Sequence, residues 1–414
     1  MTLNYIWLAF FLVSFAIAFF QWAVTGDDQI FKTVVDGIFK SANDSVELSF
    51  KLIGVMTLFL GFMNVGEKAG AIRFLSRVVG PFFGRLFPDV PDRHPAMGHM
   101  MMNFSANLLG LDNAATPFGL KAMQSLQELN PEKERASNAQ IMFLVLHASG
   151  LTLIPVSIIA MRAAVKPPAA NPTDIFIPCM IATFAATVAA LVIVSIRQRI
   201  NLLQPVVLGW LLGISALIGL LIAYLKIFLD QPGIERFSTV LSNGLILLIF
   251  LVFLAGGMWK RINVFEAFIE GAKGGFDVAI RIIPYLVAML VAISVLRSSG
   301  AFEFVTDGLT TLFSAMGMRT DFIQALPTAL MKPLSGSGAR AMMVDTMTRF
   351  GADSFPGRLS AIFQGSSDTT FYVVAVYFGS VAVKDTRYAI PSMLLADLVG
   401  ILTAISVAYL FFGG

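Results

Sequence analysis

Polar residues that could bind a small molecule or an ion lie in two segments that are otherwise apolar. The candidate ligands of the first segment, residues 97–122, are Asn103, Asn107, Asp112, Asn113 and Thr116. Those of the second, residues 322–347, are Ser335 and Ser337 in a Ser-Gly-Ser-Gly run. Glycine and proline break a helix, and the freed backbone groups find partners at membrane depth only inside protein or beside a water-filled cavity. We therefore expect both segments to be re-entrant hairpins that line a polar cavity.

A third polar run, Gln364 to Thr370, carries a carboxylate at Asp368. An ionisable group within an apolar segment is costly unless it is paired or functional. We expect Asp368, Ser367 and Thr370 to bind a coupling ion, Na⁺ or H⁺, because an oxygen-rich set suits those ions better than zinc or copper. The remaining polar residues of the run are expected to bind substrate, namely Gln364, Ser366 and Thr369. The alternative for Asp368, as for Asp112, is a helix cap.

The histidines and the cysteine offer little further chemistry. His147 lies in an apolar segment and either relays protons or is simply hydrogen-bonded within the helix bundle. His94 and His99 lack a carboxylate at zinc-site spacing, and Cys179 is the single cysteine. Arg340 and Asp345 in the second hairpin are expected to form an ion pair. We expect no metal site, and no cofactor beyond a possible coupling ion.

Composition identifies the class of protein. Hydrophobic residues make up 57% of the 414 residues and charged residues 13%, and the mean hydropathy is +0.78. These values are typical of a membrane protein with several spanning helices. A net charge of +3 gives no basic field for nucleic acid, and no phosphate-binding Gly-Lys-Ser/Thr loop for ATP occurs. No nucleophile–base pair or carboxylate pair at catalytic spacing is visible, so we expect no enzyme.

The sequence predicts an all-α polytopic membrane fold with about nine transmembrane helices. Each predicted span is long enough to cross about 30 Å of hydrocarbon, and some are extended by an amphipathic run. The spans are residues 3–24, 52–66, 140–161, 175–196, 205–228, 241–259, 282–296, 360–383 and 388–412. The amphipathic runs are residues 30–50 and 264–280.

An internal repeat organises these spans. At a displacement of 230 residues Gly70 aligns with Gly300, and at 218 residues Ser149 aligns with Ser367. Each half holds four spans and a hairpin, and the unpaired span 205–228 between them inverts the second half. We therefore predict a first half at 1–200, a bridging helix at 201–234 and a second half at 235–414. Inverted repeats with broken helices are a recurrent architecture of secondary transporters.

The hairpin motifs resemble a known family. HPAMGHMMMNFSANLLGLDNAATPFGLKA, from residue 94, is similar to spore maturation protein A. LMKPLSGSGARAMMVDTM and GSSDTTFYVVAVYFGSV, from residues 330 and 365, are similar to spore maturation protein B. The chain thus resembles a fusion of two members of the nucleoside-recognition, or Gate, group. The membrane domains of that group are similar to parts of nucleoside and ferrous iron transporters. This resemblance implies a transport-like core. The family motif GSTETTFY has glutamate where this chain has Asp368, one methylene shorter.

These observations predict a cation-coupled secondary transporter of a small polar solute, nucleoside-like or another metabolite, whose site lies between the two hairpins. A non-transporting inner-membrane scaffold of cell-envelope or spore maturation machinery is the alternative. We expect a homo-oligomer in the lipid bilayer of the bacterial inner membrane, with no nucleic-acid partner. The excess of Lys and Arg on the N-terminal side of the predicted topology favours a cytoplasmic N-terminus.

Overall fold

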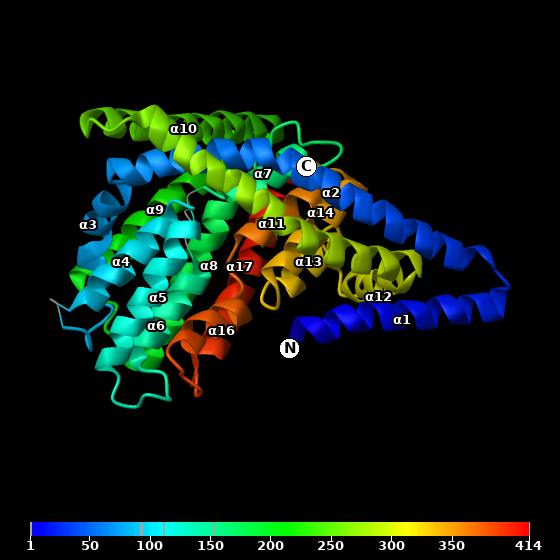
Figure 1. Ribbon diagram of the computed structural model, residues 1–414, viewed down its shortest axis with the longest axis horizontal. Coiled ribbons are helices and arrows are strands. Elements are labelled where there is room, and N and C mark those ends of the chain that lie inside the picture. Colours follow the sequence, from blue (N-terminus) through cyan, green and yellow to red (C-terminus); the bar gives the residue numbers. More distant parts are fainter. Residues whose placement is uncertain (1, 92–93, 111, 151, 153, 414) are drawn as a thin grey trace. The chain divides into compact units, whose positions relative to one another are not determined.

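The computed structural model describes residues 2–91, 94–110, 112–150, 152 and 154–413. Side chains are described in these ranges apart from those at residues 2–4, 6, 112–114, 231, 279 and 281. Every regular element in the described part is a helix (Figure 1), and extended residues pair only at an isolated bridge between Arg135 and Asp385. The predicted all-α class is confirmed.

Helices of the two halves follow one another in the same order. The first half contains α1 (Thr2–Thr25), α2 (Gln29–Ala69), α3 (Ala71–Phe83), α4 (Pro95–Leu108), α5 (Asp112–Leu129), α6 (Asn138–Ser149), α7 (Val156–Ala164) and α8 (Phe176–Gln198). After α9 (Pro205–Phe228) come α10 (Gln231–Trp259), α11 (Val264–Ser298), α12 (Ala301–Ala315), η1 (Ile323–Ala325), α13 (Leu326–Met331), α14 (Gly336–Phe350), α15 (Phe355–Gly365), α16 (Thr370–Ser380) and α17 (Ala389–Phe412). The series α1–α8 thus corresponds to α10–α17, with α9 unpaired. The inverted relation of the halves stays a prediction.

Among the described residues, seven helices are long and apolar enough to cross a membrane: α1, α2, α8, α9, α10, α11 and α17. Two of the nine predicted spans are not continuous helices. Residues 140–161 form α6 and α7, and residues 360–383 form α15 and α16. Gly150 and Pro155 bracket the first break, and Gly365 precedes the second. Glycine and proline both disfavour helix continuation, which explains why these apolar stretches are interrupted.

Each predicted amphipathic run continues into its span as one helix. Residues 30–50 belong to α2, of 41 residues, and residues 264–280 belong to α11, of 35 residues. At 1.5 Å per residue both helices exceed the thickness of the hydrocarbon layer. A glycine with positive φ separates each from the next helix: Gly70, with φ 92°, precedes α3, and Gly300, with φ 76°, precedes α12. These are the two glycines that the repeat aligns.

Both predicted hairpins fold as two helices that pack on each other. In the first hairpin α4 packs along α5, and in the second α13 packs against α14. Pro95 occupies the first turn of α4, where the missing N–H costs nothing, and His94 caps it by accepting from the Ala96 N–H at 3.3 Å. The re-entrant position of these hairpins in a membrane stays a prediction.

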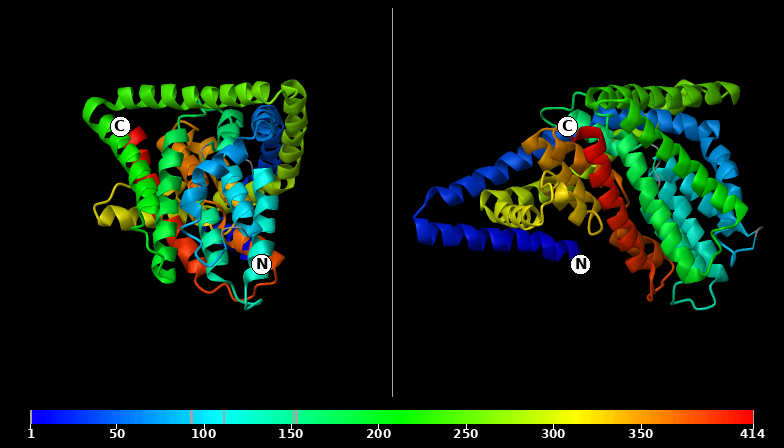
Figure 2. Two further views of the ribbon diagram at one scale, coloured as in Figure 1. Left: turned by 90° about the vertical axis from the view of Figure 1, so that its left-hand side faces the viewer. Right: turned by 180° about the vertical axis from the view of Figure 1, so that it is seen from behind.

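The helices form two compact units. Unit 1 comprises residues 1–57, 157–172 and 274–364, and unit 2 comprises residues 58–156, 173–273 and 365–414. Within unit 2, α17 packs along α8, and α6 packs against both (Figures 1 and 2). Within unit 1, α12 contacts α1 and η1. Each unit takes residues from both halves of the predicted repeat.

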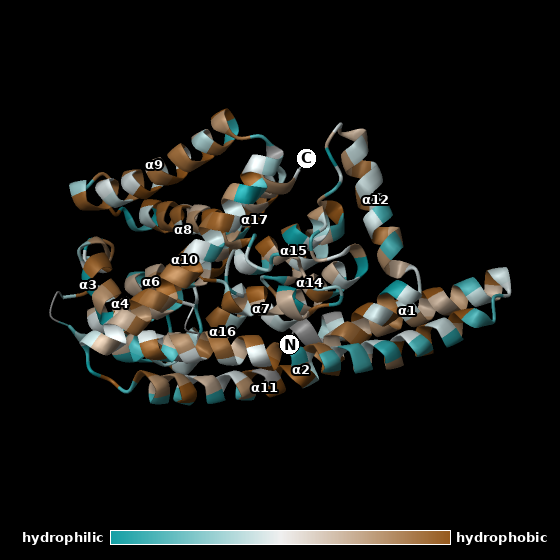
Figure 3. Ribbon diagram, turned by 90° about the horizontal axis from the view of Figure 1, so that it is seen from above, coloured by the Kyte–Doolittle hydropathy of each residue, from teal (hydrophilic) through white to brown (hydrophobic). Residues whose placement is uncertain are grey.

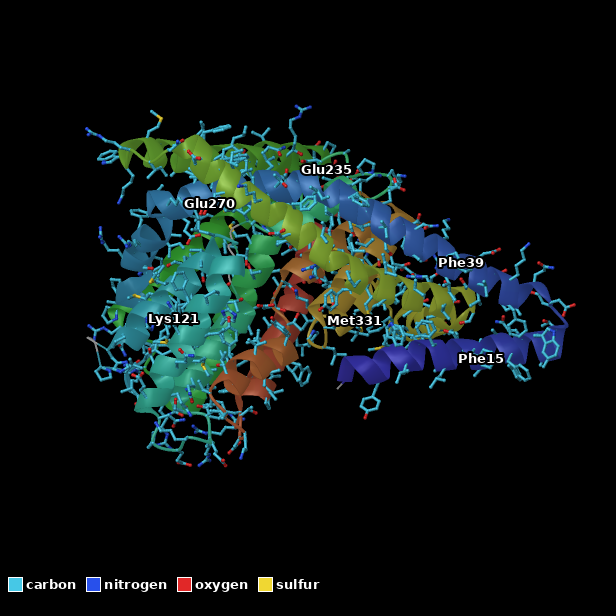
Figure 4. All side chains as sticks on the ribbon, viewed as in Figure 1. Phe15, Phe39, Lys121, Glu235, Glu270 and Met331 are labelled. Atoms are coloured by element: carbon cyan, nitrogen blue, oxygen red, sulfur yellow. The ribbon has the colours of Figure 1, made fainter. Side chains whose placement is uncertain are left out.

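Several helices expose apolar side chains. In the apolar window of α9 only 6% of residues are buried, and in that of α1 only 11%. Apolar residues run along α9 in Figure 3, and Phe15 and Phe39, 65% and 66% exposed, project from α1 and α2 in Figure 4. Such surfaces are stable against lipid chains rather than water. The chain is a multi-pass membrane protein.

Candidate functional site

The site in unit 2 is built where α6 ends and α16 begins. A capping box starts α6, because the Ser137 hydroxyl accepts from the Gln140 N–H while the Gln140 side chain accepts from the Ser137 N–H. The helix runs for 12 residues to Ser149, and all but its first residue are buried. This cap and this packing fix the position of His147, two residues before the end of α6.

The chain segment before α16 pairs with the end of α6. The Asp368 N–H donates to the Ala148 carbonyl at 2.7 Å, and the Thr187 hydroxyl of α8 donates to the Ser149 carbonyl at 3.2 Å. The last carbonyls of a helix lack partners within the helix, so groups from elsewhere must satisfy them in an apolar environment. The two helix breaks, which the repeat aligns, are therefore joined directly.

Five residues surround this junction: Asn103, Asn107, His147, Asp368 and Tyr377, which we call the helix-break cluster. The His147 Nδ1 atom lies 2.9 Å from Asn103 Oδ1 and 2.8 Å from Asn107 Nδ2. The Asn103 Nδ2 group donates to the Ala115 carbonyl of α5 at 2.7 Å, which turns Asn103 Oδ1 toward the ring. One ring nitrogen thus has an acceptor and a donor within hydrogen-bond distance.

The second ring nitrogen of His147 faces Asp368. His147 Nε2 and Asp368 Oδ2 are 3.9 Å apart, while Asp368 Oδ1 accepts from the Thr369 N–H at 2.7 Å. The His147 side chain is 4% exposed, whereas that of Asp368 is 48% exposed. The carboxylate therefore lies between a buried imidazole and an accessible surface.

Tyr377 closes the cluster on the α5 side. Its ring packs edge-on against that of His147 with 4.8 Å between centroids, and its hydroxyl hydrogen-bonds with Thr116 and Asn103. A Cβ atom at Gly119 would lie 2.4 Å from the Tyr377 ring. Only glycine leaves room for the tyrosine at this point of α5.

A buried acid lies next to the cluster. The Thr370 hydroxyl donates to Asp397 Oδ2 of α17 at 2.7 Å, and both residues are at least 96% buried. Analysis of the sequence did not single out Asp397 or Tyr377. A lone acid in the otherwise apolar span 388–412 was the available signal for Asp397, whereas a tyrosine in an apolar helix resembles ordinary packing.

The second hairpin lies in unit 1. Ser335 caps α14 by accepting from the Gly338 N–H at 3.0 Å, and its hydroxyl lies 3.2 Å from that of Ser337. Gln364 is 94% buried, and its Oε1 atom has no hydrogen-bond partner. Asp345 pairs with Arg297, whose Nη2 atom lies 2.5 Å from Asp345 Oδ2, and the expected Arg340–Asp345 pair stays a prediction.

The structure brings several of the predicted site residues together. Unit 2 holds Asn103, Asn107, Thr116 and the run from Ser366 to Thr370, whereas Ser335, Ser337 and Gln364 belong to unit 1. Asp112 and Asn113 lie outside the residues whose side chains are described. The described residues include no group of three His, Cys, Asp or Glu side chains placed to hold a metal ion. A common cavity between the two hairpins stays a prediction.

Comparisons with known proteins support the resemblance. The Gate model, described as nucleoside recognition, matches residues 49–165 and 279–384. Spore maturation protein B of Bacillus subtilis (strain 168) is 46% identical over 173 residues, which cover 42% of this chain and 96% of that protein. Spore maturation protein A of the same strain is 41% identical over 160 residues, or 39% of this chain and 81% of that protein. The two relatives match different parts of the chain, as in a fusion. No solved structure matches the chain significantly.

Proposed function

Because the chain belongs to the Gate (nucleoside recognition) family, we propose that it is a cation-coupled secondary transporter of a small polar solute. The observation that carries this proposal is the junction of the two helix breaks, where the Asp368 N–H meets the Ala148 carbonyl. Broken helices in corresponding positions of two repeats are the usual place for substrate and ion sites in secondary transporters.

The chemistry of the junction supports the same function. Amide, imidazole, hydroxyl and carboxylate groups converge there within a chain whose mean hydropathy is +0.78. In hydrocarbon each unsatisfied polar group costs several kcal/mol, so such a concentration of polar groups is retained where it binds something. Nucleosides and other metabolites with several hydroxyl or amide groups are the class of solute that this set can bind.

Flux into liposomes tests the proposal. Purified protein is reconstituted and given a proton or Na⁺ gradient with a panel of radiolabelled nucleosides, nucleobases, amino acids and carboxylic acids. We expect gradient-dependent uptake of at least one solute, and loss of the gradient dependence in Asp368→Asn. The control is Glu128→Gln, because Glu128 also lies 3.9 Å from a histidine, His94, but is 72% exposed.

Absence of flux for the whole panel, with protein correctly folded and inserted, would contradict a transporter. The second candidate, a scaffold or accessory factor, is favoured by the names of the relatives, which refer to spore maturation. A scaffold would be indicated by a partner protein that co-purifies in stoichiometric amounts, with cellular activity unchanged by Asp368→Asn.

A further inference from the structure

We propose that His147 and Asp368 together form a proton-binding site, and that this proton is the coupling ion of the transport cycle. The proton binds to His147 Nε2, on the side that faces the Asp368 carboxylate. The coupling role rests on the proposed function, whereas the proton site itself does not.

Hydrogen bonding gives a proton on His147 Nδ1 an acceptor. Asn103 is held by the Ala115 carbonyl so that its Oδ1 atom, 2.9 Å from His147 Nδ1, can accept from an Nδ1–H group. A neutral imidazole carries one proton, so this bond leaves Nε2 with a free lone pair. An incoming proton therefore binds at Nε2, and the resulting N–H points toward Asp368 Oδ2.

The arrangement also suits release of the proton. The neutral ring keeps a partner in either tautomer, because Asn107 Nδ2 lies 2.8 Å from Nδ1 and can donate to it when the proton is on Nε2. A buried histidine with only one possible partner would be fixed in one form. Here His147 Nδ1 has a hydrogen-bond partner whether or not it carries a proton.

The groups around Asp368 favour a proton over Na⁺. A hard cation needs several oxygen atoms converging on the carboxylate. Instead, a ring nitrogen faces Asp368 Oδ2, the Thr369 N–H occupies Oδ1, and the Thr370 hydroxyl is directed to Asp397. The Asp368 side chain is 48% exposed and that of His147 4% exposed, so the carboxylate is the accessible member of the pair.

Among the described side chains, those around the ring are mostly uncharged. From α4 come the amides of Asn103 and Asn107, and from α16 the phenol of Tyr377. The Thr187 hydroxyl of α8 is bonded to the Ser149 carbonyl, and Asp397 of α17 accepts the Thr370 hydroxyl. Of the carboxylates whose side chains are described, Asp368 is the one that faces the imidazole.

Protonation would act on the junction of the helix breaks. At 3.9 Å the ring and the carboxylate are not yet hydrogen-bonded. An imidazolium facing a carboxylate forms a charge-assisted hydrogen bond of about 2.7–2.9 Å. Because the Asp368 N–H is already bonded to the Ala148 carbonyl at the end of α6, the gap closes by rotation of the Asp368 side chain toward the ring, just before α16 begins. This movement is how proton binding would couple to the conformation of the transporter.

Nitrogen NMR on ¹⁵N-histidine-labelled protein in lipid nanodiscs tests the site without any solute. The chain has three histidines, so a His94→Gln/His99→Gln background leaves only the His147 signals. The titration runs from about pH 8.5 to about pH 5, and we expect the ring to carry one proton, on Nδ1, at its alkaline end and to gain a second, on Nε2, as the pH falls. In Asp368→Asn the His147 ring should stay neutral at pH values where the wild-type ring is doubly protonated. Glu128→Gln should leave the protonation of His147 unchanged.

Two amide variants separate this arrangement from a merely structural histidine. Asn103→Leu removes the acceptor, so the neutral ring should shift its proton to Nε2 with Asn107 donating to Nδ1. Asn107→Leu removes the donor and should leave the proton on Nδ1. A ring that stays neutral throughout the pH range, or that is indifferent to Asp368→Asn, would overturn the proton site.

Flux measurements then test the coupling role. A solute that enters with a proton gradient, and loses this dependence in His147→Gln or Asp368→Asn, supports the proposal. Flux driven by Na⁺ alone would overturn the coupling role while leaving the proposed transporter intact. A titrating His147 with no flux of any solute would instead contradict the transporter function.

Discussion

Among the described side chains, Arg162 of unit 1 is the most deeply buried cation. Its side chain is fully buried and donates to the Ala352 carbonyl at 2.7 Å and the Pro172 carbonyl at 3.2 Å. Its guanidinium also lies 3.2 Å from the Asp353 carboxylate, which is 36% exposed. The five donors of arginine allow it to satisfy several loop carbonyls at once.

We expect Arg162→Leu to lower the free energy of unfolding by about 3–5 kcal/mol, because it leaves buried acceptors without donors. Asp353→Asn keeps one acceptor oxygen where the carboxylate uses two, for Arg162 and for the Ala170 N–H, and should therefore cost about 1–3 kcal/mol. Denaturant unfolding in detergent, followed by tryptophan fluorescence, measures both. Equal losses for the two variants would contradict the role given to the carbonyl contacts.

Two glycines of α11 set how closely this helix approaches α2. In unit 1 a Cβ atom on Gly275 would lie 2.4 Å from the Thr57 backbone nitrogen. In unit 2 a Cβ atom on Gly271 would lie 2.4 Å from the Leu60 carbonyl oxygen. Glycines four residues apart are the small-residue pattern that brings membrane helices into contact.

Gly275→Ala should therefore destabilise the protein by about 1–3 kcal/mol, the usual cost of overpacking. Its control is the neighbouring Gly274→Ala, since nothing lies within 4 Å of a Cβ there. Alanine favours a helix over glycine by about 1 kcal/mol, so this variant should be as stable as the wild type or more stable. Thermal unfolding in detergent gives the comparison, and a loss at Gly274 similar to that at Gly275 would refute it.

The sequence predicted some of these features and missed others for physical reasons. Asn103, Asn107 and Asp368 could be found because polar groups are conspicuous in apolar segments. The partner of a residue depends on helix rotation and on distant contacts, so the Asn103–His147 and Thr370–Asp397 bonds could not be derived. The helix breaks were missed because apolar content continues across them, although Gly150, Pro155 and Gly365 were available signals.

The two halves of the repeat and the two compact units divide the chain differently. The relatives of the halves are two separate proteins of one strain. Each compact unit, however, takes segments from both halves, since unit 1 includes residues 1–57 and 274–364. A half expressed alone therefore lacks part of the packing of both units, whereas the two halves together supply all of it.

This division predicts the result of cutting the chain in the loop before α9. Fragments 1–200 and 201–414, the second keeping α9 to carry it across the membrane, should co-purify at equal stoichiometry when expressed together. Each fragment alone should be degraded or aggregate, because its apolar faces lack the partner helices, such as α17 for α8. Affinity purification through a tag on one fragment, with size-exclusion chromatography, measures the outcome. Independent, stable and monodisperse fragments would show that the halves, and not the interleaved units, are the folding units of this protein.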